Sequence, residues 1–124
     1  FGFEKVTKLL NLCEKHHIFC MLDMHTAPGG QNPDWHSDNR TGVPQFWEFK
    51  QLRDQLVKVW GEIAKRFGAK YSYLLGYDLL NEPAMANWTY LNEFFGDTVR
   101  EIRQHDRNHA VILESDHFAM DFQT

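Results

Sequence analysis

Polar and ionisable side chains stand at three points of the sequence, each directly after a short apolar run. They are, in chain order, Asp23, His25, Asn81, Glu82, Glu114 and His117. Carboxyl and imidazole groups hold and transfer protons, and amides bind polar ligands. Such groups meet at one place when the apolar runs before them are neighbouring strands of one parallel sheet. The pattern therefore supports an enzyme.

Segments of helical periodicity separate the apolar runs. Apolar residues recur at spacings of three and four within 3–13, 49–67 and 91–102, whereas the runs 18–24, 73–80 and 110–113 have the length and composition of strands covered on both faces. Gly68 stands where a left-handed cap would end the second helix, and Asn87 suits the start of the third. Alternating elements of this length predict an α/β fold made of parallel βαβ units.

Length and composition narrow the class of protein. The 124 residues are 43% hydrophobic and 24% charged, with a net charge of −4, which is typical of one globular domain and excludes disorder. The acidic balance disfavours nucleic acid as a partner, and no apolar run reaches the roughly 20 residues that a membrane span needs. Cys13 and Cys20 fall at apolar positions and are expected to be buried free thiols. The chain starts at Phe1 without a Met, and its first helical segment begins almost at once, so we expect it to be part of a longer protein.

Two motifs carry a resemblance to a known family. The segment Tyr77-Asp78-Leu79-Leu80-Asn81-Glu82-Pro83 resembles the fourth strand of retaining β-glycosidases built on (β/α)8 barrels, which ends in Asn-Glu-Pro. Residues 22–32 resemble the third strand and loop of glycoside hydrolase family 5, the cellulase and exo-β-1,3-glucanase family, and residues 111–116 are similar, more loosely, to its fifth strand. The resemblance implies that residues 1–124 form a partial catalytic domain, about half of a (β/α)8 TIM barrel, running from the second helix to the fifth strand.

This resemblance implies a retaining glycoside hydrolase that acts on a β-glucan-type polysaccharide or oligosaccharide. Glu82 matches the general acid/base, Asn81 the residue that binds the 2-hydroxyl of the reacting sugar, and His25 the histidine that orients the substrate. The mechanism needs a second carboxylate about 5 to 5.5 Å away. The family carries that nucleophile on its seventh strand, beyond Thr124, so we expect the isolated chain to be inactive.

The long segment 25–45, rich in Gly, Pro and turn formers, predicts a loop that exceeds the usual length of about 2 to 6 residues and so is expected to carry function. Sugar rings pack an apolar face on aromatic side chains and leave their hydroxyls to polar neighbours. Trp35 is therefore the expected sugar platform, with Gln31 and Asn32 as further substrate contacts. The remaining expectations are Glu114 and His117 as secondary cleft residues, Asp23 and Asp78 as structural supports on the inward face, Trp47 and Trp88 as cleft candidates, and Trp60 as core.

A carbohydrate substrate is the expected partner, without a cofactor or a metal, and without nucleic acid or membrane contacts. The resemblance favours an extracellular or periplasmic location for the parent protein. One alternative is a non-catalytic, sugar-binding half-barrel that self-associates or pairs with the missing half of the barrel, which its mass on size exclusion would reveal. The other is a metal-dependent hydrolase, which a metal titration would reveal, with ligands drawn from Asp23, His25, His36, Asp38, Asp116 and His117.

Overall fold

A computed structural model describes residues 2–121, which form a three-stranded parallel sheet in the order β1-β2-β3. The strands are β1 (Cys20–Asp23), β2 (Leu74–Asp78) and β3 (Ala110–Ile112). The helices are α1 (Gly2–His16), the 3-10 turn η1 (Trp35–Ser37), α2 (Gln45–Glu48), α3 (Lys50–Phe67), α4 (Trp88–Arg103) and the single turn α5 (Asp116–Ala119). The predicted alternation of helices and strands is confirmed, with shorter strands than the apolar runs suggested.

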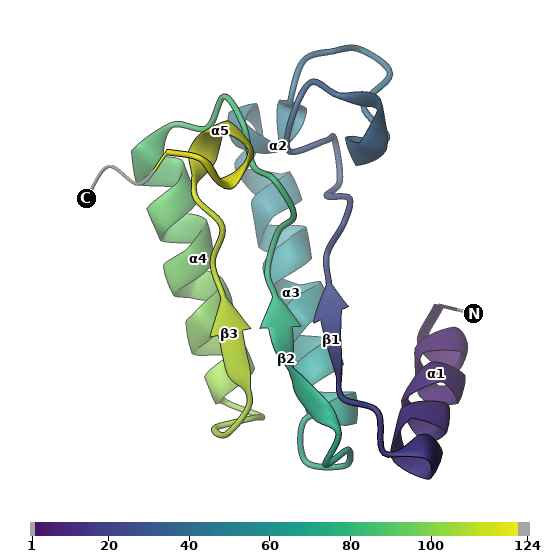
Figure 1. The fold of residues 1–124 in the computed structure, drawn as a ribbon. Coiled ribbons are helices and arrows are strands. Elements are labelled where there is room, and N and C mark those ends of the chain that lie inside the picture. The colour runs from purple at the N-terminus through teal and green to yellow at the C-terminus, as the bar shows by residue number, and fades with distance from the viewer. Residues whose placement is uncertain (1, 122–124) are drawn as a thin grey trace.

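The two long helices α3 and α4 cover one face of the sheet, whereas the loops that follow the strands lie at its carboxyl edge. The three strands point the same way in Figure 1, with α3 and α4 behind them and α1 beside β1. The long loop after β1 and the turn α5 lie at the end toward which the strands point. Met21, Leu75 and Ile112 are exposed apolar residues of the strands, as expected of a sheet that these helices cover on one side.

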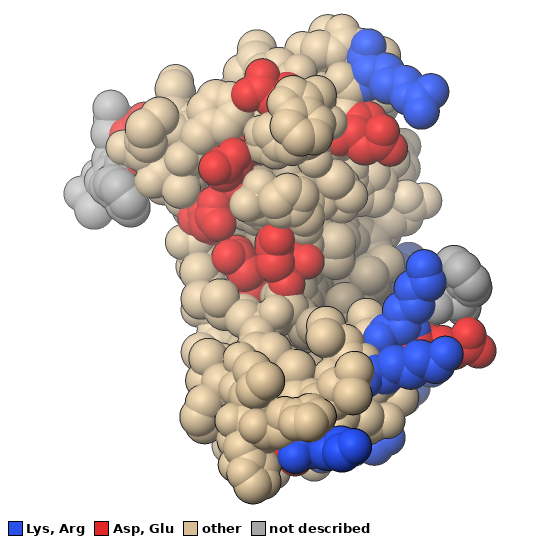
Figure 2. Space-filling view, turned by 45° about the vertical axis from the view of Figure 1, so that its right-hand side comes forward, with Lys and Arg blue, Asp and Glu red and all other residues tan. Residues whose placement is uncertain are grey.

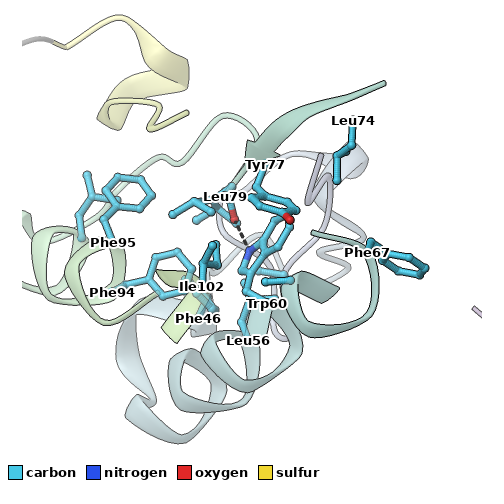
Figure 3. Packing of buried hydrophobic residues seen from close by; sticks show 14 of the residues in the cluster. Phe46, Leu56, Trp60, Phe67, Leu74, Tyr77, Leu79, Phe94, Phe95 and Ile102 are labelled. Carbon is cyan, nitrogen blue, oxygen red and sulfur yellow. Dashed lines mark hydrogen bonds between the residues drawn. The ribbon is translucent and has the colours of Figure 1, made fainter. Parts of the chain in front are cut away.

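The core lies between the sheet and the two long helices. Trp60 of α3 is fully buried, donates its indole N–H to the carbonyl of Leu79 over 3.1 Å, and meets the Tyr77 ring edge-on at 5.7 Å (Figure 3). Burial of a large apolar side chain of this kind contributes about 1.5 to 3 kcal/mol. The prediction that Trp60 belongs to the core is confirmed, and its bond to Leu79 ties α3 to the segment that leads out of β2.

Strand register brings the ends of the three strands to one edge. Asp23 pairs with Asp78, which pairs in turn with Ile112, so the two aspartates are neighbours on one face, as their parity predicted. Backbone bonds continue past the strands, from Met24 N–H to the Asp78 carbonyl at 3.1 Å and from Asn81 N–H to the Met24 carbonyl at 3.1 Å. The residues that follow β1 and β2 are therefore held side by side.

Several local predictions are tested by the structure. Asn87 caps α4 by accepting the Thr89 N–H at 2.9 Å, as predicted. Gly68 is not left-handed, because its φ is −56°; a glycine is needed there because a Cβ would lie 2.6 Å from the Asp106 side chain. Both cysteines are free, Cys13 buried and Cys20 only partly buried. Within residues 2–121, no helix combines the length and apolar character needed to cross a membrane.

Two tryptophans, Trp47 and Trp88, are the sequence-predicted candidates for lining a cleft. Trp47 is buried and donates its indole N–H to the Gln31 carbonyl at 2.9 Å, so it supports the loop from inside and does not line a cleft. Trp88 is partly buried against the hydrophobic core at the start of α4. A position near a helix start does not distinguish a ring that faces solvent from one that faces the core, since the direction of the helix decides it.

Candidate active site

Glu82 lies four residues after β2, at the carboxyl edge of the sheet. Its side chain is 44% exposed, and its Oε2 atom lies 3.4 Å from Nε2 of His36. Its backbone N–H donates to Oε2 of Glu114 at 2.7 Å, and its carbonyl accepts from Nδ2 of Asn32 at 2.9 Å. Three segments far apart in the sequence, from the loop after β1, the end of β2 and the end of β3, therefore meet at this residue.

The loop after β1 is built on two fully buried amides, Gln31 and Asn32. The Gln31 amide donates to the carbonyls of His25 and Asn81, both at 2.9 Å, and its oxygen accepts the Ala27 N–H at 3.0 Å. Asn32 donates to Glu82, as above, and accepts the N–H two residues ahead at 3.0 Å. Direct sugar contact was expected of both, but buried amides committed to backbone groups instead position the loop and the strand ends.

Imidazole and indole rings line the loop beside the Glu82 carboxylate. His25 is exposed, with Nδ1 3.0 Å from Oδ2 of Asp23, and its ring centroid lies 6.0 Å from that of His36. Trp35 is 89% exposed and meets the His36 ring edge-on at 6.0 Å. Trp35 thus presents its ring to solvent beside His36, and such exposure is what a sugar platform needs.

His36 is a neighbour of Glu82, although the sequence suggested it only as a candidate metal ligand. Its side chain is only 18% exposed, and its Nε2 atom lies between Oε2 of Glu82 and Oδ2 of Asp34, the latter at 3.9 Å. The only local signal was its place beside Trp35 in a long polar loop. The contact with Glu82 joins positions 46 residues apart, so only the folded chain reveals it.

The carboxyl group of Asp78 interacts with those of Asp23 and Glu114 at the carboxyl edge of the sheet. Burial, and then the charges of Glu114 and Asp23, raise the pKa of Asp78 to about 6, with a further contribution from a hydrogen bond shared with Glu114. Among the described residues, Oδ1 of Asp78 is buried without a hydrogen-bond partner. Acidic side chains gather in the upper half of the face in Figure 2, the end toward which the strands point. Asp78 is thus partly buried beneath the site, whereas Asp23 is exposed and pairs with His25.

The structure separates the two secondary candidates. Glu114 binds the backbone of Glu82 directly. His117 is exposed and pairs with Asp116 at 3.1 Å and Asp121 at 3.7 Å, within and next to α5. Asp116 is itself buried and accepts the Ala86 N–H at 3.1 Å, which fastens α5 to the loop after Glu82. Among residues 2–121, no three His, Cys, Asp or Glu side chains converge as a metal site requires, so the ligands of the metal alternative are not brought together.

Asn81 directly precedes Glu82 at the carboxyl edge of the sheet. The residue is partly exposed. Its backbone N–H donates to the Met24 carbonyl, and its own carbonyl accepts from the Gln31 amide. A partly exposed amide on a fixed backbone can both donate to and accept from a sugar hydroxyl. Glu82 and Asn81 therefore offer a proton-transfer group and a hydroxyl-binding group side by side.

Comparison with known proteins agrees with this arrangement. The model of the family described as "Cellulase (glycosyl hydrolase family 5)" matches residues 2–123. A β-xylosidase of Phanerodontia chrysosporium is 40% identical over 121 residues, which are 98% of this chain and 25% of that protein. A glucan 1,3-β-glucosidase of Candida oleophila is 30% identical over 125 residues, 88% of this chain and 28% of that protein. The chain thus spans about a quarter of the length of these relatives.

Solved structures give the same result for the fold. The crystal structure of a glycoside hydrolase superposes with a TM-score of 0.77 at 25% identity, over 94% of this chain and 36% of that one. An endoglucanase from Thermotoga maritima superposes with a TM-score of 0.71 at 18% identity, over 95% of this chain and 33% of that one. The prediction of a partial (β/α)8 barrel is confirmed. Since the family model covers nearly all of its residues, this chain belongs to glycoside hydrolase family 5, the cellulase family.

Proposed function

We propose that the protein is a retaining β-glycoside hydrolase that acts on a β-glucan-type polysaccharide or oligosaccharide, with Glu82 as its general acid/base. The observation that carries this proposal is the half-exposed Glu82 carboxylate at the carboxyl edge of the sheet, 3.4 Å from His36. The names of the relatives, a β-xylosidase and a glucan 1,3-β-glucosidase, support a β-linked substrate. Structures of the Thermotoga maritima enzyme in complex with cellobiose and with mannotriose support a carbohydrate ligand.

Two proton transfers fall to Glu82 in this mechanism. In the first step its carboxyl group gives a proton to the glycosidic oxygen as the bond to the anomeric carbon breaks, while a second carboxylate attacks that carbon. In the second step the Glu82 carboxylate takes a proton from the water that displaces the second carboxylate. We place the second carboxylate in the remaining part of the barrel, and we expect the isolated chain not to hydrolyse glycosides.

Three residues around Glu82 would bind the sugar. Asn81 is proposed to bind the 2-hydroxyl of the reacting sugar, because its amide is next to Glu82 and its backbone is fixed by Gln31. Trp35 offers an exposed ring for the apolar face of a pyranose. His25, which is exposed and paired with Asp23, is proposed to orient the substrate between Asn81 and Trp35. The same polymeric substrates favour a location outside the cell or in the periplasm.

The sheet has two unpaired edges, where further strands can add. β1 and β3 are edge strands in this sheet, and unpaired edges invite association. We propose that these edges pair with the remaining strands of the barrel, and that the isolated chain associates with itself when those strands are missing. Size-exclusion chromatography checks this, since a monomer near the chain's 14.7 kDa would contradict it.

Replacing Glu82 with glutamine in the full-length protein tests the function. Glutamine keeps the size of the side chain but cannot transfer a proton, so hydrolysis of β-glucan, laminarin, cellulose or mannan is expected to fall by about 10²- to 10⁴-fold. Glu62→Gln is the matched control, because Glu62 lies on the surface of α3 and pairs with Arg66. Full activity of the Glu82→Gln protein would contradict the proposed function.

A further inference from the structure

The backbone of Glu82 has an unusual conformation. Its φ is +46°, in the left-handed region that residues with a Cβ atom rarely adopt. Glycine, and to a lesser degree asparagine and aspartate, visit this region readily, whereas a glutamate loses about 1 to 2 kcal/mol there. The surrounding structure must therefore hold Glu82 in place, because the residue itself does not favour this geometry.

Both backbone polar groups of Glu82 are held by side chains. Glu114 accepts its N–H at 2.7 Å, and Asn32 donates to its carbonyl at 2.9 Å. Backbone pairing between the ends of β2 and β3 is still present at Leu79, whose N–H donates to the Ile112 carbonyl at 3.2 Å. At Glu82, the segment after β3 contributes a side-chain carboxylate as the hydrogen-bond acceptor, in place of a backbone carbonyl. The bend that turns Glu82 out of the strand direction thus coincides with the change of acceptor.

The two supports reach Glu82 from opposite neighbours of β2. Glu114 lies two residues after β3, and Asn32 lies in the loop that follows β1. Asn32 is fully buried, and its oxygen accepts the N–H of Asp34, so its amide cannot turn away without losing that bond. A hydrogen bond to a charged group is worth about 1.5 to 3 kcal/mol, which is enough to offset the cost of the left-handed backbone.

We propose that Glu114 is the positioning residue that aims the Glu82 carboxyl group at the glycosidic oxygen, with Asn32 as its counterpart on the carbonyl side. Glu114 acts on the backbone of Glu82 and need not touch the sugar. Asp78, which shares a hydrogen bond with Glu114, and Asp23, which pairs with Asp78 across the sheet, are the other acidic groups near Glu114, and His36 faces the carboxylate end of Glu82. This inference rests on the proposed role of Glu82 as the general acid/base.

Variants of Glu114 in the full-length protein separate the hydrogen bond from the charge. Glu114→Gln keeps an acceptor oxygen at the same reach, whereas Glu114→Ala removes it. Glu93→Ala is the matched control, because Glu93 is exposed on α4. Each protein is assayed on two aryl β-glycosides of the same sugar, one with dinitrophenol as leaving group and one with unsubstituted phenol. Dinitrophenolate departs without a proton, but phenol needs one from the acid.

A misdirected acid affects only the substrate that needs its proton. We expect Glu114→Ala to lower kcat/KM for the phenyl glycoside by about tenfold or more, since small displacements of catalytic groups are costly, and to change the dinitrophenyl glycoside far less. Glu114→Gln is expected to stay within about threefold of the unmodified protein on both substrates, because its amide oxygen accepts the same N–H. An equal loss on both substrates, or no loss on either, would overturn the inference.

Two further comparisons keep the outcome decisive. If Glu114→Ala does not fold, Glu114→Asp takes its place: it keeps the charge but is one methylene too short to reach the Glu82 N–H, and it must show the same dependence on the leaving group. Glu82→Gln is measured in the same assay. Should Glu82→Gln itself show no such dependence, the proposed function fails; should it show one that Glu114→Ala and Glu114→Asp both lack, only the positioning role fails.

Discussion

Two aspartates at opposite edges of the same sheet have opposite environments. Asp106, in the turn before β3, accepts hydrogen bonds from the Tyr77 hydroxyl at 2.5 Å and from the N–H groups of Asn108 and His109 at 3.0 and 3.3 Å, and its Oδ2 lies 2.6 Å from Nδ1 of His109. Burial by itself raises the pKa of Asp106, but these hydrogen bonds outweigh it and lower the value to about 2. Asp78, at the end of β2, has a pKa raised to about 6.

The difference separates stability from function. At the amino edge a buried carboxylate meets enough donors to favour its charge, and the turn before β3 is fastened to β2 through Tyr77. At the carboxyl edge the partly buried Asp78 meets other carboxylates instead, and Glu82 is held in a left-handed conformation. Strain and unfavourable charge are therefore concentrated where chemistry is proposed, and the opposite edge holds the strands together.

Asp106→Ala should produce the largest change in stability. The substitution leaves the Tyr77 hydroxyl and two backbone N–H groups without their acceptor, which is expected to reduce the free energy of unfolding by about 3 kcal/mol. Because its pKa is lowered when folded, this contribution is present above pH 3.8 and is lost as the pH falls toward about 2. Urea unfolding of the full-length protein measures both effects.

Asp54→Ala is the control for that experiment, since Asp54 makes an exposed pair with Lys50 and is expected to matter by less than about 1 kcal/mol. The kcat of folded Asp106→Ala protein should stay unchanged, because Asp106 lies at the opposite edge from Glu82. A selective loss of kcat would break the division of roles between the two edges.

His36→Phe should alter catalysis without a comparable loss of stability. Phenylalanine keeps a ring beside Trp35 but removes the nitrogen that lies 3.4 Å from the Glu82 carboxylate. An imidazole at this distance holds the Glu82 carboxylate in one orientation, which a phenyl ring cannot do. We expect kcat/KM to fall by about tenfold, because small displacements of a catalytic group are costly. His16→Phe at the exposed end of α1 is the control, and an unchanged kcat/KM of the His36→Phe protein would contradict the assignment.

Asp78→Asn should stabilise the protein near neutral pH. The folded protein holds the Asp78 proton up to about pH 6, whereas the unfolded chain releases it near 3.8, so the stabilising contribution of this group is lost as the pH rises through about 6. Asparagine removes that loss, and the expected gain at pH 7 is about 1 kcal/mol after screening by solvent. Unfolding at pH 3 and pH 7 compares the two proteins; a gain of equal size at both would show that charge is not its cause.

Trp35→Ala should give the smallest effect, confined to substrate binding. The ring is 89% exposed, so its removal is expected to leave the melting temperature unchanged. Loss of a stacking surface for one sugar raises KM by about threefold with little change in kcat. Binding and melting curves of the full-length protein test both parts, and a lowered melting temperature would assign Trp35 to the structure instead of the cleft.

Local patterns predicted the elements but not the roles of several polar residues. The Asn81-Glu82 pair was expected at the end of a buried strand, and the structure has it there because apolar runs and prolines report strand ends locally. Gln31 and Asn32 were expected at the sugar, but they are buried. An amide reads the same in the sequence whether it faces solvent or the backbone, and its partners here, Asn81 and Glu82, lie 50 residues away.

By itself the sequence determined the order of helices and strands, the family, and the position of Glu82 after a strand, since all of these depend on short-range spacing and on contiguous motifs. Only the tertiary structure decided that Glu114 and Asn32 hold the Glu82 backbone, that His36 faces its carboxylate, and that Asp78 and Asp106 titrate in opposite directions. The physical reason is that a carboxyl group's charge depends on burial and on donors within a few ångströms. Those neighbours come from distant segments that meet only when the chain folds.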